Sequence, residues 1–168
     1  RKELSAAKIP MVIEHVKAYV DAGTKVIVGC VHTQMADALK EAFPSCAFIT
    51  GKVSPDKRQA QVDRFQDDPS CNPMIANMIA GGTGYTMTAS SLVICAEVDW
   101  VPAIVEQFED RAWRRGQQNS VLCQHLAVEG SIDARLIEVL LLKQDIVRSA
   151  LDIDALSEAQ KESLLFAS

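Results

Sequence analysis

The pattern that most constrains the fold of this chain is the alternation of short apolar runs with longer amphipathic segments. The runs are rich in β-branched residues, as in 25–31 and 92–96. The segments between them place apolar residues at helical spacing, for example Ile9, Val12 and Val16. Such alternation is typical of parallel βαβ units with helices on both faces of one sheet. We therefore predict an α/β fold with three α-β-α layers and a mainly parallel sheet.

Capping and breaking residues set the boundaries of these segments. Ser54 before Pro55 is typical of a helix start, and Thr33 and Ser131 can cap two further helices. The predicted strands are 25–31, 46–50, 74–79, 92–96 and 121–128, and the predicted helices are 7–22, 33–42, 55–67, 102–115 and 131–151, with a last amphipathic stretch at 154–166. This order divides the chain into an N-terminal helix (1–24), one α/β domain (25–151) and a helical extension (152–168).

The composition narrows the class of protein. No apolar run approaches the roughly 20 residues of a membrane helix, and the N-terminus lacks the apolar core of a signal peptide. The five cysteines form no Cys-x-x-Cys pair, which argues against a zinc site and favours a reducing, cytoplasmic setting. With a net charge of -5, any contact with nucleic acid must use a local patch or another domain. Because the chain begins with Arg1 and not Met, we expect a piece of a longer protein.

A glycine-rich turn follows the strand predicted at 74–79. It lies at the C-terminal edge of the sheet, where ligands bind in such folds. Gly82 and Gly84 let the backbone approach a ligand with its N–H groups outward. The absence of Gly-Lys-Ser/Thr excludes a P-loop, and position 87 is methionine where a dinucleotide fingerprint requires glycine. A phosphate cradle and a plain tight turn both stay open for this segment.

The predicted helix 102–115 carries the charged residues of greatest interest. At helical spacing, Gln107, Arg111 and Arg114 form a strip along the border of its apolar face. The arginine fork matches phosphate oxygens, and pre-aimed arginines neutralise charge on a transferred phosphoryl group in NTPases. The alternative is a solvated helix with weak ion pairs, such as Asp110 with Arg114. Spacing alone leaves these two interpretations open.

Taken together, the motifs resemble those of one family. The sequence 107–117, Gln-Phe-Glu-Asp-Arg-Ala-Trp-Arg-Arg-Gly-Gln, resembles motif VI of the Swi/Snf-type DNA-dependent ATPases of helicase superfamily 2. Further similarities are 80–89 to motif V, 97–102 to the element between these motifs, 26–31 to motif IV, and Gly51 with Arg58 and Phe65 to the segment after motif IV. The likeness runs from about Lys25 to Leu151. Within the family it is most similar to the annealing-helicase-like branch and its bacterial or phage relatives.

The resemblance implies a fold and an activity. The chain is then the second, C-terminal RecA-like lobe of an ATP-dependent DNA translocase or remodeller. Its implied partners are DNA and the N-terminal RecA-like lobe of the same protein. That first lobe makes most of the contacts to ATP and Mg²⁺. The Walker A lysine and the acidic motif of that first lobe do not occur in this sequence. We therefore expect the isolated chain to be inactive, and a bacterial version to be associated with the nucleoid.

The resemblance also implies roles for individual residues. Arg111 and Arg114 act as arginine fingers on the γ-phosphate of ATP, and Gln107 and Asp110 position them and couple to motif V. Gly82 and Gly84 shape the backbone near the nucleotide and the DNA. The candidate DNA contacts are Lys52, Thr83 and Arg58, and no residue of this lobe is implied as a metal ligand.

Three positions depart from the family pattern. Val101 stands where asparagine usually precedes the proline, and Trp113 stands in place of histidine. Met78-Ile79 opens motif V in place of a small hydroxyl residue. Two other functions stay open beside the motor lobe: a RecA-like module that binds DNA or protein without catalysis, and a stand-alone α/β domain for a nucleotide or metabolite.

Overall fold

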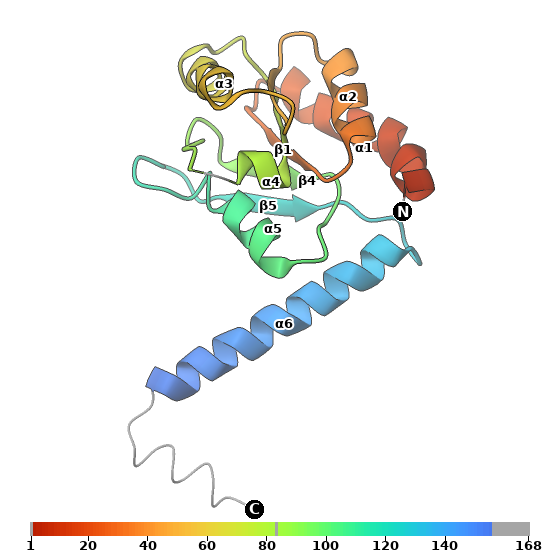
Figure 1. Cartoon of the computed structure of the whole chain (residues 1–168), viewed down its shortest axis with the longest axis vertical. Coiled ribbons are helices and arrows are strands. Elements are labelled where there is room, and N and C mark those ends of the chain that lie inside the picture. Colours follow the sequence, from red (N-terminus) through yellow and green to blue (C-terminus); the bar gives the residue numbers. More distant parts are fainter. Residues whose placement is uncertain (1, 83, 156–168) are drawn as a thin grey trace, which may run out of the picture.

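One five-stranded sheet with helices on both faces forms the centre of the computed structural model, which describes residues 2–82 and 84–155 (Figure 1). All strand pairs are parallel, in the order β2-β3-β1-β4-β5. The strands are β1 (Ile27–Cys30), β2 (Ala47–Ile49), β3 (Met74–Asn77), β4 (Leu92–Cys95) and β5 (Leu122–His125). The helices are α1 (Lys2–Asp21), α2 (Thr33–Ala42), α3 (Pro55–Asp67), α4 (Met78–Gly81), α5 (Pro102–Glu109) and α6 (Ile132–Ala155). Among these residues no helix is long and apolar enough to cross a membrane.

Two hydrophobic cores lie on the two faces of the sheet, because successive side chains of a strand point to opposite sides. Val28 and Ile75 face the core that contains residues of α1 and α2. Their neighbours Ile27 and Met74 face the core formed with α3, α5 and α6. The predicted three-layer α-β-α fold is therefore confirmed, and its sheet is entirely parallel.

The predicted strand 74–79 is too long at its C-terminal end. The chain leaves the sheet at Asn77 and forms the four-residue helix α4, which the sequence analysis missed. The Asn77 side chain accepts hydrogen bonds from the backbone N–H groups of Ile79 and Ala80, so it caps this helix. The glycine-rich segment consequently begins inside a helical turn and not in a simple turn between strands.

The predicted helix 102–115 is also too long. Helix α5 ends at Glu109, and tighter turns follow, in which the Arg111 N–H bonds the Phe108 carbonyl at 3.1 Å and the Ala112 N–H bonds the Glu109 carbonyl at 3.1 Å. The Arg111 carbonyl accepts a hydrogen bond from Met87 N–H at 2.8 Å. This contact uses a carbonyl that a continuing helix would direct to residue 115.

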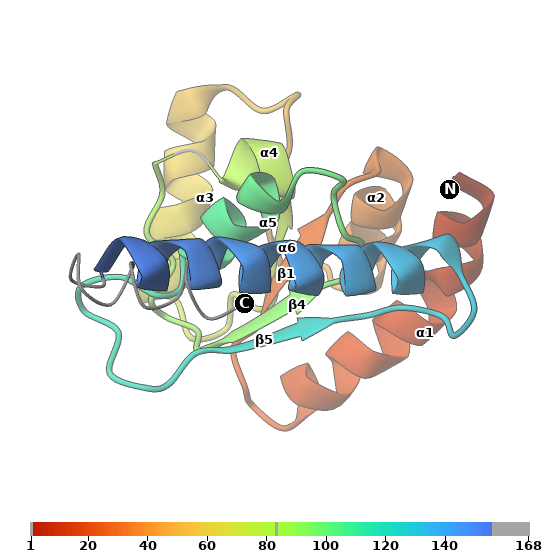
Figure 2. The ribbon, with the colours of Figure 1, turned by 90° about the horizontal axis from the view of Figure 1, so that it is seen from below.

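Helix α6 is the longest element and extends past the sheet (Figures 1 and 2). The Ser131 hydroxyl accepts a hydrogen bond from Ala134 N–H at 3.3 Å, as expected for its predicted capping role. Thr33, in contrast, is the first residue of α2, and His32 holds the cap position. Helix α6 continues without a break to Ala155, and 156–168 lie outside the described residues. The divisions at 24/25 and 151/152 stay predictions.

Candidate functional site

The glycine-rich segment and α5 meet at the C-terminal edge of the sheet. A Cβ atom added to Gly82 would lie 3.5 Å from Gln107 Oε1 and 2.8 Å from the Met78 carbonyl oxygen. Two predicted site residues, Gly82 and Gln107, are therefore neighbours. A side chain at position 82 would collide with backbone, so this close approach requires glycine.

Phe108 anchors α5 on the end of the sheet. Its ring is fully buried, and a Cβ atom added to Gly29 of β1 would lie 2.6 Å from it. A Cβ atom added to Gly81 would lie 3.1 Å from the same ring and 2.9 Å from the Ala76 Cβ atom. The two glycines thus let the aromatic ring pack directly on backbone. This packing fixes the position of α5 and therefore of the turns that follow it.

Arg111 is the buried member of the two predicted arginines. It is only 5% exposed, and its Nε donates a hydrogen bond to the Gln107 carbonyl at 3.0 Å. Among the residues that the structure describes, no carboxylate lies within ion-pair distance of Arg111. Burial lowers the pKa of the Arg111 guanidinium, the nearby charge of Arg114 lowers it further, and Asp110 opposes these effects. The charge of Arg111 is therefore costly to bury in this lobe alone.

Arg114 lies in the bend after these turns and is exposed. It lines an open hollow of about 450 Å³ together with Trp113, Gln117 and the residues 118–121. Trp113 is 77% exposed. The predicted strip along a helix is therefore wrong in its geometry. Gln107 is on α5, whereas Arg111 and Arg114 are presented by turns that α5 and Met87 position.

Gln117 holds this segment in place, a role that sequence reasoning missed. Its Nε2 lies 2.8 Å from the Ser90 carbonyl, 3.2 Å from the Ala112 carbonyl and 3.3 Å from the Thr88 carbonyl. These contacts join the turns that carry Arg111 and Arg114 (110–117, the arginine turns) to the chain that leads into β4. The last glutamine of the motif VI pattern was the available signal, but no partner could be assigned from sequence.

Lys52 reaches a second hollow, which lies at the C-terminal edge of the sheet. This hollow of about 210 Å³ lies at the start of α2 and is lined by Thr33, Ala36, Thr50, Gly51, Lys52 and Asn77. Helix N-termini attract anions because their first N–H groups are unpaired within the helix. An exposed lysine beside such an end forms a local patch that suits phosphate, although the chain as a whole is acidic.

Arg58 supports the loop that carries Lys52. Its Nε donates to the Val53 carbonyl at 2.7 Å, and its Nη2 donates to the Gly51 carbonyl at 3.1 Å. The Arg58 guanidinium therefore already donates hydrogen bonds to two backbone carbonyls. Arg58 thus positions 51–53, and its expected contact with DNA stays a prediction.

Glu97 ties the ends of β1 and β4 together and was not anticipated. This buried carboxylate accepts hydrogen bonds from the N–H groups of Val31 and His32, both at 2.8 Å, and lies 2.7 Å from the His32 ring nitrogen Nδ1. Asn77 completes this connection, since its Nδ2 donates to the Val31 carbonyl at 2.9 Å. An acidic residue directly after an apolar strand was the only sequence signal.

The remaining predicted residues are less closely tied to this arrangement. Gly84 adopts a positive φ of 80°, which favours glycine, and has open space around it. Asp110 is exposed next to Arg111. Thr83 lies outside the described residues. The structure thus contains two separate candidate regions, one around the arginines and one around Lys52.

Comparison with known proteins is consistent with the helicase motifs in these regions. The family described as "Helicase conserved C-terminal domain" matches residues 7–116. The SWI/SNF-related matrix-associated actin-dependent regulator of chromatin subfamily A-like protein 1 of Drosophila melanogaster is 31% identical over 144 residues, which cover 83% of this chain and 19% of that protein. The human DNA annealing helicase and endonuclease ZRANB3 is 33% identical over 156 residues, which cover 90% of this chain and 14% of that protein. The chain therefore spans a fifth or less of these relatives.

Solved structures give the same fold. The crystal structure of the C-terminal part of the Fun30 ATPase domain matches with a TM-score of 0.70 and 26% identity, covering 78% of this chain and 44% of that one. The Sulfolobus solfataricus SWI2/SNF2 ATPase C-terminal domain matches with a TM-score of 0.62 and 20% identity, covering 91% and 65%. At that identity the second likeness bears on the fold alone.

Proposed function

The chain belongs to the helicase C-terminal domain family of Swi/Snf-type superfamily 2 ATPases, and from this premise we propose that its arginine turns complete the ATP site of a DNA translocase. It is the C-terminal lobe of an ATP-dependent helicase or translocase of this family. Use of ATP follows from that membership. The arginine fingers, the DNA-tracking surface and the role of Mg²⁺ are our proposal.

The observation that carries the proposal is the burial of the Arg111 guanidinium without a carboxylate partner among the described residues. A guanidinium at 5% exposure with one side-chain hydrogen bond contributes little to folding, because burial disfavours its charge. The same burial strengthens its attraction for an anion, since the local dielectric constant is low. Arg114 adds a second, solvent-facing guanidinium nearby. Such a pair suits the negative charge on the γ-phosphate of a nucleotide bound by another lobe.

The opposite lobe supplies the rest of the site in this proposal. ATP with Mg²⁺ binds there and provides the phosphoryl group that is transferred to water. In this chain, Gln107 and Asp110 position the arginines from the end of α5, and Gly82 keeps the backbone against Gln107. Large apolar side chains near the strand ends are exposed, with Ile79 at 61% and Trp100 at 56%. An exposed apolar surface of this kind suits contact with the N-terminal lobe.

DNA contact is assigned to the hollow around Lys52. The exposed ammonium, the Thr33 and Thr50 hydroxyls and the start of α2 offer donors to a backbone phosphate without reading its sequence. Arg58 keeps the loop in place. Thr83 of motif V remains a proposed contact to a phosphate of the same DNA strand. The DNA annealing helicase activity in the name of ZRANB3 makes DNA the proposed substrate here as well.

The test uses the full-length protein with Arg114→Ala. We expect kcat for ATP hydrolysis to fall by about 10³-fold or more, while the Kd for ATP changes only a few-fold, because an arginine finger acts mainly on the transition state. Arg115→Ala is the matched control, since Arg115 is exposed beside it and lies outside the fixed positions of motif VI.

Wild-type turnover of the Arg114→Ala protein would remove the finger assignment. An upstream lobe without a Gly-Lys-Ser/Thr motif would favour the alternative, a DNA- or protein-binding module without catalysis. The isolated 168-residue chain should show no motor-like ATP hydrolysis, because half of the nucleotide site belongs to the other lobe.

A further inference from the structure

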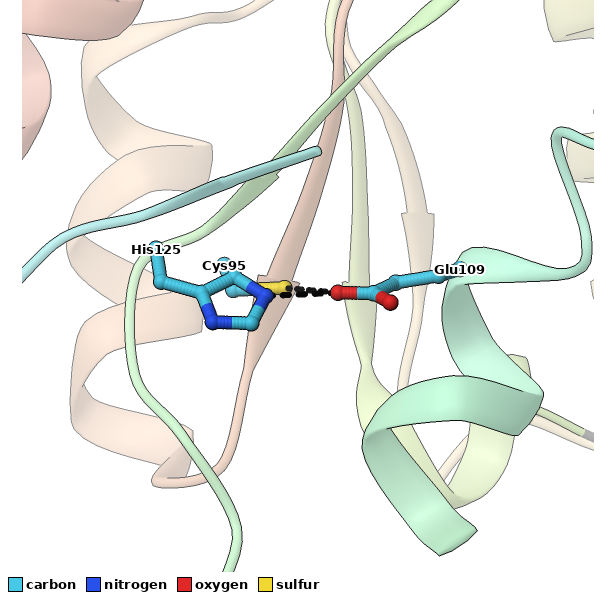
Figure 3. A group of neighbouring side chains, drawn as sticks. All are labelled: Cys95, Glu109 and His125. Atoms are coloured by element: carbon cyan, nitrogen blue, oxygen red, sulfur yellow. Dashed lines mark hydrogen bonds and ion pairs between the residues drawn. The ribbon is translucent and has the colours of Figure 1, made fainter. Parts of the chain in front are cut away.

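Three side chains able to bind a metal converge where β4, β5 and α5 end (Figure 3). Cys95 is the last residue of β4, His125 is the last residue of β5, and Glu109 is the last residue of α5. Cys95 and His125 are direct partners in the parallel register of the two strands. The fold therefore brings together three residues that are 14 and 16 positions apart in sequence.

The geometry of this cluster is close to that of a metal centre. His125 Nε2 lies 2.6 Å from Glu109 Oε1, and Cys95 Sγ lies 3.9 Å from the same oxygen. All three ligand atoms lie within 4.8 Å of one another. Around a tetrahedral zinc ion with bonds of about 2.0–2.3 Å, ligand atoms stand roughly 3.3–3.8 Å apart. A cation would therefore require only a small separation of the imidazole and the carboxylate.

The ligand types select the class of cation. A thiolate and an imidazole favour zinc-like ions, whereas Mg²⁺ and Ca²⁺ prefer sites made of oxygen atoms. Cys95 is fully buried, while the side chains of His125 and Glu109 are 20% and 18% exposed. The site is thus closed on the sulfur side and open on the other. That partial exposure gives the cation a path of entry from solvent, from which a water can also serve as fourth ligand.

We propose that Cys95, Glu109 and His125 form a binding site for a zinc-type divalent cation. On binding, the Cys95 thiol releases its proton to solvent and the thiolate bonds the metal. His125 bonds through Nε2 and keeps one proton on Nδ1, so the imidazole stays neutral. Glu109 binds as the carboxylate. One thiolate and one carboxylate then balance the charge of the cation.

The state without metal is consistent with this exchange. Without a metal, Cys95 Sγ lies 3.9 Å from Glu109 Oε1, and its S–H can donate to that oxygen. A bound cation takes the place of this contact, and the thiol proton is released. The spacing of the cysteines predicted no zinc site, because these ligands come from separate elements.

The site lies directly before the arginine turns. Glu109 is followed by Asp110 and Arg111, so a metal bond to Glu109 fixes the end of α5 against β4 and β5. This is a structural role for the cation. It does not depend on ATP hydrolysis, and it differs from the Mg²⁺ that accompanies ATP.

The experiment titrates the purified full-length protein, stripped of metal, with Co²⁺ and then displaces the Co²⁺ with Zn²⁺. We expect one Co²⁺ per chain at this site, with a thiolate-to-cobalt charge-transfer band that Zn²⁺ removes and that Mg²⁺ does not. Cys95→Ser should abolish the band. His125→Gln should weaken Zn²⁺ binding by at least about 10–100-fold, the loss known for supporting residues of such sites.

Cys46→Ser is the matched control, because Cys46 is another buried thiol and lies outside the cluster. It should leave the band and the affinity unchanged. Circular dichroism and thermal unfolding of each variant separate loss of the site from loss of the fold, and Glu109→Gln provides a variant in a partly exposed position. The absence of a band in the wild-type protein, or its persistence in Cys95→Ser, overturns the proposal.

Discussion

The arginine turns (110–117) and the lysine loop (50–58) lie at opposite edges of the sheet and are held in different ways. The loop follows the C-terminal end of β2, whereas the turns run to the N-terminal ends of β4 and β5. The first region is connected to the core at several points, through buried Arg111, through Met87 and through the side chain of Gln117. The second is an exposed loop whose carbonyls Arg58 binds, and Lys52 projects from it into a shallow hollow.

This difference corresponds to what each region is proposed to do. Stabilising the charge of a transition state requires donors fixed in advance, because misplacement of even 1 Å is costly. Holding a phosphate on a moving strand requires a charge but not a fixed position, since the contact is made and released repeatedly. We expect substitutions to be severe in the arginine turns and mild in the lysine loop.

Arg111→Met provides the strongest test of this comparison. We expect ATP hydrolysis by the full-length protein to fall about 10³-fold, while the free energy of unfolding stays unchanged or rises by about 1 kcal/mol. The physical reason is that methionine fills a similar volume without a buried charge. Steady-state kinetics and urea unfolding measure the two effects.

Arg111→Lys serves as the control for charge alone, because it keeps the cation but lacks the planar fork. It should also lose most of the turnover. A clear loss of stability in Arg111→Met, with turnover reduced only in proportion to the folded fraction, would show that Arg111 is a structural residue.

Gln117→Ala tests the connection between the arginine turns and β4. Removing the side-chain contacts to Ala112, Thr88 and Ser90 should lower the free energy of unfolding by about 1–3 kcal/mol, because buried carbonyls lose their donor. Turnover should fall by roughly ten-fold as Arg114 loses its fixed position, a loss of about 1.4 kcal/mol. Thermal unfolding and kinetics measure these effects.

The neighbouring Gln118→Ala is the control for this experiment, since Gln118 is exposed and makes only a long contact of 3.4 Å to the Gly116 carbonyl. It should leave both quantities unchanged. Equal effects of the two substitutions would contradict a specific role for Gln117.

Lys52→Ala should have the smallest effect. We expect DNA affinity to fall only a few-fold, with about one unit less in the slope of log K against log salt, because one phosphate contact is lost. Turnover at saturating DNA should not change. Lys57→Ala, on the exposed side of α3, is the control, and an unchanged salt slope in Lys52→Ala would remove the DNA assignment.

Sequence alone was sufficient for the fold, because the relevant signals are local. Alternation of β-branched runs and helical segments gave the parallel α/β architecture, and the Ser54–Pro55 pair marked the start of α3 correctly. The predicted ends of β3 and α5 were wrong because tertiary contacts override the local sequence pattern there. Asn77 ends β3 by capping α4, and the turns after α5 follow from the Met87 contact with the Arg111 carbonyl.

The candidate site could be identified by residue but not by geometry. The spacing of Gln107, Arg111 and Arg114 suggested one strip on a helix, whereas the structure separates a buried arginine from an exposed one. The Met87 contact of Arg111 and two of the three partners of Gln117, Thr88 and Ser90, lie more than 20 residues away in the chain, which no local pattern records. The triad of Cys95, Glu109 and His125 required the register of β4 with β5 for the same reason.

The ion pair between α1 and α6 has a consequence for protein engineering. Lys8 is almost completely buried and donates to Asp133 at 2.9 Å and to the Leu126 carbonyl at 2.7 Å. Removing one member of a buried pair costs about 3–5 kcal/mol. A chimera that joins this lobe to a foreign N-terminal helix at position 25 must therefore supply a matching lysine or replace Asp133 as well, so that no buried charge is left unpaired.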